Sequence, residues 1–288
     1  MWLGATSLCF VHSKGSAFAP AIQHIQETSW SHCARSPCGG SLAMGNELPR
    51  VASPAARLQG VQPRLGLRAT VDAGTLEFIK WFALLAMVLD HTATLVFHYE
   101  KFNWPHELGR LAFPLFAYVL GAKLGLQVKQ NGTLGSSSAK RLWWWALISM
   151  APYYLATGRI WPPDIFFTLA LGATACLVST RPLRLAPKVL AHLCIAMASL
   201  ACDYMAPGVY LIVSVFAFYR RPAIGPALAI LACCAGLVVL NGTLFTLLAI
   251  PVALLAHAVS IPLRPYRWFF YAFYPAHLGL LAAWVHFN

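Results

Sequence analysis

Charged side chains are scarce in this chain of 288 residues. They make up 10% of the sequence, and Asp and Glu together number only 9, whereas ordinary globular proteins carry about 25% charged residues. So few charges cannot cover the surface of a soluble protein of this length. Because 59% of the residues are hydrophobic, the composition excludes a soluble protein and predicts that a lipid bilayer surrounds most of the chain.

The familiar catalytic motifs are also missing. The sequence contains no Gly-Xaa-Ser-Xaa-Gly nucleophile elbow, no His-Glu-Xaa-Xaa-His zinc motif and no glycine-rich phosphate loop. Cys33 and Cys38 lack a second Cys/His pair at the spacing of a zinc site. We therefore expect neither a serine or cysteine nucleophile nor a bound metal.

The first part of the chain has no long apolar run. Residues 1–72 are rich in Ser, Ala, Pro, Gly and Arg and show no helical periodicity. This composition predicts a disordered cytoplasmic tail that precedes a transmembrane domain at 73–288. Met44 is an alternative start of the protein.

From Leu76 onward, apolar segments follow one another regularly, most of them near the ~20 residues that cross ~30 Å of hydrocarbon. We therefore expect an all-α, polytopic transmembrane bundle of about nine spans. The predicted spans are residues 76–98, 108–128, 142–158, 164–180, 187–202, 205–219, 223–240, 243–260 and 267–286.

The net charge of +12 does not indicate a nucleic-acid partner, because the Lys and Arg residues lie in short segments between apolar runs. Every second connection is rich in bases, and the connections between these are poor in them. Basic residues gather in the cytoplasmic loops of membrane proteins. The alternation therefore predicts a cytoplasmic N-terminus and a C-terminus on the outer side.

This topology gathers six ionisable side chains towards the outer side. Ionisable groups inside spans are costly and usually face the interior of a bundle or a wet cavity. Asp164 and Asp203 can also be explained as loop or helix-capping residues. Asp90 and His91 stand inside an otherwise apolar run, which favours a functional role. The six residues are Asp90, His91, Arg110, Asp164, Asp203 and His277.

His91 is the candidate general base of this group. Neighbouring helical residues point about 100° apart, so Asp90 is poorly placed to orient His91. We expect Asp164 or Asp203 to orient it instead, and Asp90 can pair with Arg110. The remaining histidines are weaker candidates: exposed loop positions are expected for His98 and His106, and ordinary core positions for His192 and His257.

Three motifs in order resemble the TraX family. They are the segment 76–91, which ends in Asp-His, the segment Gly109-Arg-Leu-Ala-Phe-Pro-Leu-Phe116, and the segment Phe269-Phe-Tyr-Ala-Phe-Tyr-Pro-Ala-His-Leu278. The resemblance covers about residues 75 to 288. One departure is Asp164, where the family pattern leads us to expect Asn.

The resemblance implies a multi-pass acetyltransferase of the bacterial inner membrane that acts in conjugation on the pilin N-terminus. Acetyl-CoA would be the donor, and an amine or hydroxyl of a protein or glycan the acceptor. His91 would be the base, Arg110 would stabilise the oxyanion or hold the donor, and His277 would be a second acid or base. Asp90 would be the fourth residue of this catalytic group. Supporting roles are expected for Asp164, Asp203 and Tyr274. The donor phosphates would bind Lys140, Arg141, Arg220, Arg221, Arg264 and Arg267.

Two other functions are compatible with the same residues. A transporter or channel could use Asp90, His91 and Arg110 as a proton or ion relay. A membrane scaffold without catalytic activity could use the buried charges for packing alone.

Overall fold

The computed structural model describes residues 73–97, 104–258, 263–264 and 266–287. The predicted disordered tail, including Met44, lies outside the described residues. Within them every regular element is a helix, which confirms the all-α prediction. The elements are α1 (Ala73–Leu95), α2 (Trp104–Gly109), α3 (Ala112–Asn131), α4 (Ser137–Thr157), α5 (Ile165–Thr180), α6 (Leu185–Ser199), α7 (Met205–Arg220), α8 (Ile224–Asn241), η2 (Leu244–Leu248), α9 (Ala249–Ala258) and α10 (Arg267–Phe287).

Each predicted span coincides with helix, but two spans are interrupted. The span expected at 108–128 consists of α2 and α3, which meet at Arg110 and Leu111. The span expected at 243–260 begins as the 3₁₀ helix η2, whose first turn is capped by the Thr243 hydroxyl accepting from Phe245 N, and continues as α9. Three of the described segments are long and apolar enough to cross a membrane: Trp104–Asn131, Ile224–Asn241 and Trp268–Phe287. The total of nine spans stays a prediction.

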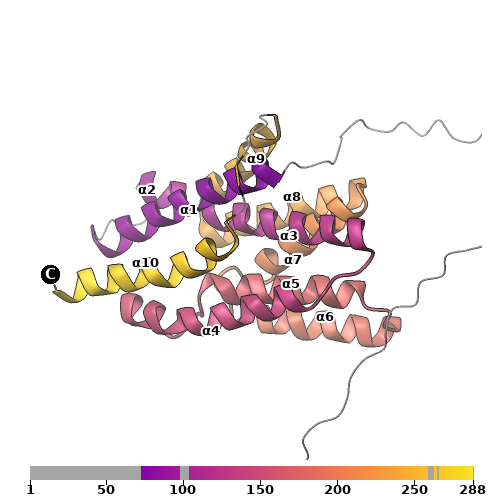
Figure 1. The fold of residues 1–288 in the computed structure, drawn as a ribbon, viewed down its shortest axis with the longest axis horizontal. Coiled ribbons are helices and arrows are strands. Elements are labelled where there is room, and N and C mark those ends of the chain that lie inside the picture. Colours follow the sequence, from indigo (N-terminus) through magenta and orange to yellow (C-terminus); the bar gives the residue numbers. More distant parts are fainter. Residues whose placement is uncertain (1–72, 98–103, 259–262, 265, 288) are drawn as a thin grey trace, which may run out of the picture. The chain divides into compact units, whose positions relative to one another are not determined.

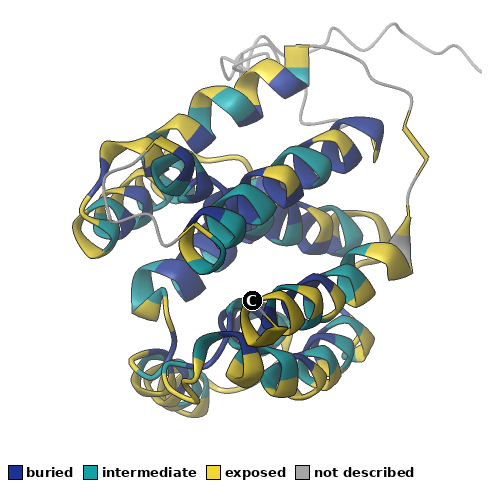
Figure 2. Cartoon of the chain, turned by 90° about the vertical axis from the view of Figure 1, so that its left-hand side faces the viewer, coloured by how far each residue is buried: buried dark blue, intermediate teal, exposed yellow. Residues whose placement is uncertain are grey.

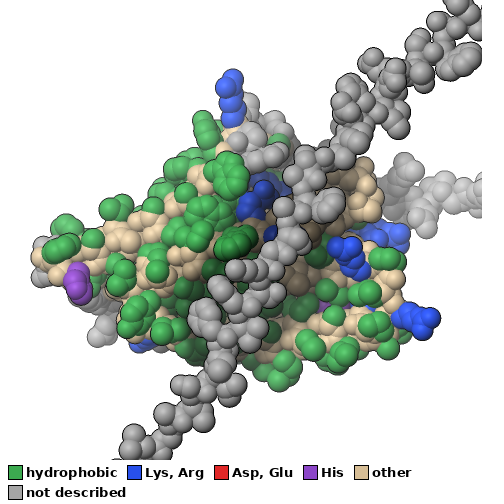
Figure 3. Space-filling view, turned by 60° about the horizontal axis from the view of Figure 1, so that its bottom comes forward, with side chains coloured by type: hydrophobic (Ala, Val, Ile, Leu, Met, Phe, Trp, Pro, Cys, Tyr) green, Lys and Arg blue, Asp and Glu red, His purple; other side chains and the backbone are tan. Residues whose placement is uncertain are grey.

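Large apolar side chains cover much of the outside of the helices. Leu185, Ile224 and Val239 each expose about four-fifths of their surface (78%, 80% and 81%). Figure 2 shows buried residues facing the interior and exposed residues facing outward, and hydrophobic side chains spread over the face drawn in Figure 3. Such a surface favours a lipid environment, because exposed apolar patches of this extent are rare on soluble monomers.

Helix α3 is central to the packing and contacts α1, α5, α7 and α9 (Figure 1). Its tightest contact, with α7, depends on two glycines one helical turn apart. A Cβ atom on Gly121 would lie 2.6 Å from the carbonyl oxygen of Ile212, and one on Gly125 would lie 2.7 Å from that of Phe216. Small residues at this spacing let two helix backbones approach closely within a membrane. The α3–α7 pair is therefore a closely packed part of the bundle.

Two short connections meet at one end of the bundle. The α3–α4 connection (132–136) and the α5–α6 connection (181–184) both lie at the right-hand end in Figure 1. Basic side chains are gathered towards the right-hand end of the face in Figure 3. The α4–α5 connection (158–164) lies at the opposite end of these helices. The bundle thus has one basic end and one end poor in bases.

A side chain at Gly121 should separate α3 from α7. We expect Gly121→Leu to lower the free energy of unfolding by about 1–3 kcal/mol or more, because overpacking a close interface displaces backbone. Thermal unfolding in detergent measures the change. Gly225→Ala is the matched control, because a Cβ atom there meets nothing within 4 Å; equal stability of the two variants would contradict this packing.

Candidate functional site

Two histidines from opposite ends of the sequence meet at the centre of the candidate site. His91 lies late in α1 and His277 lies at the middle of α10. The Nδ1 atom of His91 is 2.7 Å from Nε2 of His277. The two rings are nearly parallel, at 4°, with their centroids 4.9 Å apart.

The hydrogen bonds determine which nitrogen of each ring carries the proton. His277 Nδ1 lies 2.8 Å from the carbonyl oxygen of Tyr274. A carbonyl oxygen only accepts, so Nδ1 of His277 must be protonated, and Nε2 of the neutral ring is then an acceptor. His91 must therefore donate through Nδ1, which leaves its Nε2 unprotonated. The pair presents one basic nitrogen, held in place through two hydrogen bonds.

The second group of the site joins Asp90 to Arg110 through His106. The guanidinium Nη2 of Arg110 is 2.7 Å from Nε2 of His106, and Nδ1 of the same ring is 2.9 Å from Oδ1 of Asp90. Because arginine only donates, His106 accepts at Nε2 and carries its proton on the side of Asp90. Arg110 keeps further donors, since its Nε is buried without a hydrogen-bond partner among the described residues.

Gly109 makes this second group possible. A Cβ atom at this position would overlap the side chain of Asp90, lying 2.6 Å from its Cγ. Only a glycine lets α2 end directly against α1 at the level of Asp90. The Gly-Arg pair thus has a physical basis: the glycine gives the close approach, and the arginine that follows brings the positive charge.

The structure corrects two expectations about the histidines. His106 was expected in an exposed loop, but its side chain is only 12% exposed and stands between Asp90 and Arg110. A carboxylate was expected to orient His91, but His277 does so. The spacing of His106 and Arg110, four residues apart, was the signal available in the sequence, since such residues share one face of a helix. His98 lies outside the described residues.

Asp164 caps helix α5 and does not bond to the histidine pair. It is fully buried at the N-cap of α5, where Oδ1 accepts a 3.1 Å hydrogen bond from Phe166 N. Its Oδ2 accepts a hydrogen bond from the hydroxyl of Ser149 in α4. Asp164 therefore ties α4 to α5 and fixes the wall of the site.

Asp203 lies in the turn between α6 and α7, at the surface of the bundle. The protein packed around its carboxylate raises its pKa to about 6, and the positive charge of Arg110 opposes this rise. The next residue, Tyr204, stacks on Phe113 of α3 with ring centroids 3.7 Å apart. Asp203 is thereby kept within the electrostatic influence of Arg110, while no described contact joins it to His91.

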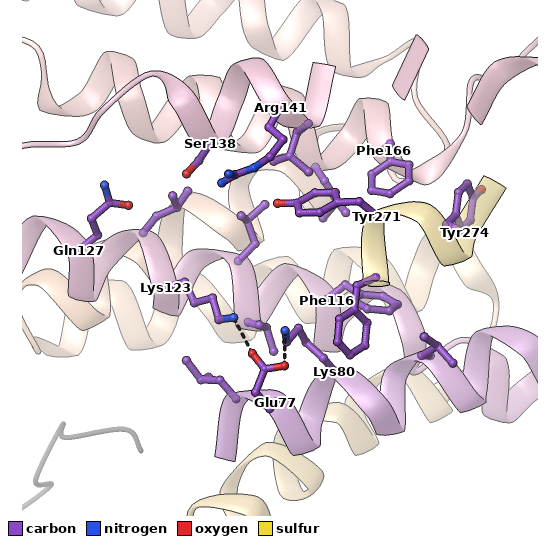
Figure 4. Close-up of a pocket in the computed structure, with 18 of the residues that line it drawn as sticks. Glu77, Lys80, Phe116, Lys123, Gln127, Ser138, Arg141, Phe166, Tyr271 and Tyr274 are labelled. Atoms are coloured by element: carbon purple, nitrogen blue, oxygen red, sulfur yellow. Dashed lines mark hydrogen bonds and ion pairs between the residues drawn. The ribbon is translucent and has the colours of Figure 1, made fainter. Parts of the chain in front are cut away.

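A cavity of about 730 Å³ opens among α1, α3, α4, α5 and α10 (Figure 4). Tyr274, the residue whose carbonyl holds His277, is one of its lining residues. The ring of Tyr274 also stands 6.2 Å, centroid to centroid, from that of His91. Tyr274 therefore stands between the cavity and the histidine pair, whose own side chains are not among the lining residues.

One carboxylate in the cavity contacts two ammonium groups. Glu77 is 1% exposed, and its oxygens lie 2.5 Å from Nζ of Lys80 and 3.0 Å from Nζ of Lys123. Figure 4 shows the two lysines converging on Glu77, with Arg141 on a facing helix. This cluster is not among the sites predicted from the sequence. Its signal was the Glu-Xaa-Xaa-Lys spacing inside an apolar run, which puts both charges on one helix face.

Of the six residues expected to bind donor phosphates, Arg141 lines the cavity, with its guanidinium carbon 5.6 Å from the ring centre of Tyr271. The side chain of Arg267 is not among those described. The others are exposed and do not line the cavity; they are Lys140, Arg220, Arg221 and Arg264. Their role stays a prediction.

The remaining histidines have ordinary partners. His257 Nε2 contacts the hydroxyls of Tyr118 and Tyr219, and His192 Nε2 lies 3.1 Å from the hydroxyl of Ser179. In the part of the chain that the structure describes, no group of three or more His, Cys, Asp or Glu side chains is arranged to hold a metal ion.

Comparison with known proteins gives the family. The family model described as TraX protein matches residues 75–285, which include both halves of the histidine pair and the Asp90–His106–Arg110 group. The chain belongs to the TraX family. No solved structure matches the chain.

Two curated relatives carry the family name. The "Protein TraX" of Escherichia coli and that of Escherichia coli (strain K12) are each 37% identical over 100 residues, covering 35% of this chain. The match spans only 38% of the length of each of these relatives. The "Probable fimbrial assembly protein FimC, serogroup H1" of Dichelobacter nodosus is 27% identical over 240 residues, covering 71% of this chain and 93% of that protein.

The proton positions in the pair can be measured. Both His91 and His277 should be neutral, with protonated Nδ1 and unprotonated Nε2, because the chain of donors ends on the Tyr274 carbonyl. Nitrogen-15 NMR of histidine-labelled protein near pH 7.5 distinguishes protonated from unprotonated ring nitrogens, and single His→Gln variants assign the signals. Protonated Nε2 on either residue would contradict the arrangement.

Proposed function

We propose that this TraX-family protein is a membrane acetyltransferase that moves an acetyl group from acetyl-CoA to an amine or hydroxyl. The observation that supports it most is the histidine pair, in which Nε2 of His91 is left basic and is held by His277. Acyl transfer to an amine or hydroxyl needs a base at that position. It also needs hydrogen-bond donors for the negative charge that develops on the carbonyl oxygen.

These groups can carry out the acetyl transfer in the following way. The acceptor nitrogen or oxygen attacks the thioester carbonyl, and Nε2 of His91 takes the proton that the acceptor loses. The new C–N or C–O bond forms and the C–S bond breaks. The CoA thiolate leaves and takes up the proton from His91, so the neutral pair is restored. His277 stabilises the transient imidazolium because it accepts a hydrogen bond from its Nδ1.

Arg110 is the proposed donor to the oxyanion. Its contact with His106 fixes the guanidinium, and its buried Nε has no other hydrogen-bond partner among the described residues. A preorganised cation of this kind is worth more in a site with little water. Asp90, at the far side of His106, keeps the arginine in place and balances its charge.

The charge distribution supports a direction of transfer. We infer an inner-membrane protein whose N-terminus and basic end face the cytoplasm, where acetyl-CoA is made, and whose C-terminus faces the periplasm. The donor would enter from the basic end and the acceptor from the opposite side. The name of one relative, a probable fimbrial assembly protein, favours an acceptor in a fimbria or pilus, of which a pilin N-terminus is the simplest.

Removal of the base tests the assignment. We expect His91→Gln to reduce the rate of acetyl transfer by about 10²- to 10⁴-fold, the usual contribution of a positioned base. Mass spectrometry of an acceptor peptide with a free N-terminus, incubated with the protein and acetyl-CoA in detergent, measures the rate.

His192→Gln is the matched control, since His192 lies on α6 and contacts Ser179 rather than the site. It should retain the activity. Size-exclusion elution and thermal unfolding establish that both variants are folded. Undiminished transfer by folded His91→Gln protein would rule out His91 as the base.

A further inference from the structure

The cavity holds more positive charge than its own residues neutralise. Lys80, Lys123 and Arg141 bring three positive charges to its lining, and Glu77 is the one acidic residue there. Glu77 is already shared by the two lysines. An excess of two charges at the wall of a bundle that faces lipid is costly, and an anion in the cavity would relieve it.

Arg141 is the cation with no acidic partner. No ion pair joins it to a described carboxylate, and its Nε is buried without a hydrogen-bond partner. It lies one turn into α4, whose first-turn residues Ser137 and Ser138 also line the cavity. The side chain of Ser136, the N-cap of α4, makes no capping hydrogen bond. The positive end of the helix dipole therefore adds to the charge of Arg141.

The lining changes character along the cavity. Basic and polar side chains lie where α3 ends and α4 begins, whereas aromatic rings lie towards the histidine pair; Figure 4 shows this change from Gln127 and Ser138 to Phe166 and Tyr274. Its volume of about 730 Å³ is large enough to hold a ligand of the size of a cofactor. The matching ligand has an anionic head and a less polar arm.

We propose that Lys80, Lys123 and Arg141 form a phosphate-binding site in this cavity, which holds the phosphate-bearing part of the acyl donor while its acyl arm passes Tyr274 to reach His91. This inference rests on the proposed function. It assigns the donor to a built cavity instead of an exposed surface, and one lining residue of this cavity, Tyr274, lies next to the ring of His91. The headgroup of an anionic phospholipid carries the same chemistry, and the test separates the two sources.

The test compares cavity and surface cations in the full-length protein. Binding of CoA to protein in nanodiscs of neutral lipid is measured by titration calorimetry. We expect R141Q and K123Q each to weaken CoA binding by about 10- to 100-fold, the loss of a charge-assisted contact to phosphate. K129Q is the control: it removes an exposed cation of α3, the helix that carries Lys123, and it should bind CoA as the wild type does. K140Q removes the exposed cation next to Arg141 and tests the surface site expected from the sequence; the cavity site predicts a CoA affinity that does not depend on Lys140.

The variants also separate binding from chemistry. R141Q and K123Q should raise KM for acetyl-CoA and leave kcat within about twofold, because the lost contact is equally strong in the ground and transition states. K123Q keeps the proposal testable if R141Q does not fold. It should fold, because the Lys123 side chain is 42% exposed and Glu77 keeps Lys80 as a partner. Wild-type CoA affinity in both folded variants would overturn the proposal.

Two outcomes distinguish this proposal from the proposed function. If the protein transfers acetyl groups and its CoA affinity depends on Lys140 rather than Arg141, the acetyltransferase function is supported and the cavity is overturned as its donor site. If CoA binding depends on Arg141 but the protein has no transfer activity, the cavity is supported as a CoA site and the acetyltransferase function is overturned. If nanodiscs that contain phosphatidylglycerol abolish CoA binding in proportion to that lipid, the phosphate site belongs to lipid headgroups and the donor assignment fails.

Discussion

A polar side chain within a helix bundle that faces lipid must find its partner inside the protein, because the hydrocarbon offers none. The polar groups near the site follow this constraint. His91 bonds to His277, which bonds in turn to a backbone carbonyl; Asp90 and Arg110 share His106; Asp164 caps α5 and accepts from Ser149. The bond from His277 to the Tyr274 carbonyl lies within α10, and each of the other links joins different helices or fixes a helix end. The polar interior therefore specifies which helices are neighbours, and it also forms the candidate site.

Close approach between backbones is the second requirement, and glycine supplies it. Gly121 and Gly125 bring α3 against α7, and Gly109 brings the end of α2 against Asp90. The Arg110 side chain can reach His106 and the neighbourhood of Asp203 because the chain breaks between α2 and α3 immediately after that glycine. The packing and the geometry of the candidate site thus depend on the same small residues.

The sequence predicted the helical class and the helical segments, and it placed Asp90, His91, Arg110 and His277 towards one side of the membrane, because charges inside apolar runs are costly and conspicuous. It predicted the wrong place for His106, since the local sequence of a lone histidine is the same whether its side chain is exposed or buried. It misplaced the partner of His91, because the contact joins residues 186 positions apart in sequence. The Glu77–Lys80–Lys123 cluster was missed for a similar reason: the i,i+3 pair was visible, but Lys123 comes from another helix.

The central claim is that donor and acceptor reach one histidine pair from opposite sides of the membrane. Sealed membrane vesicles of opposite orientation test it, because acetyl-CoA is charged and does not cross lipid. Radiolabelled acetyl-CoA should label the acceptor only when it is supplied to the face that carries the basic end of the bundle, which is the outer face of inverted vesicles. Equal labelling in intact right-side-out vesicles, with the donor supplied outside, would contradict the account.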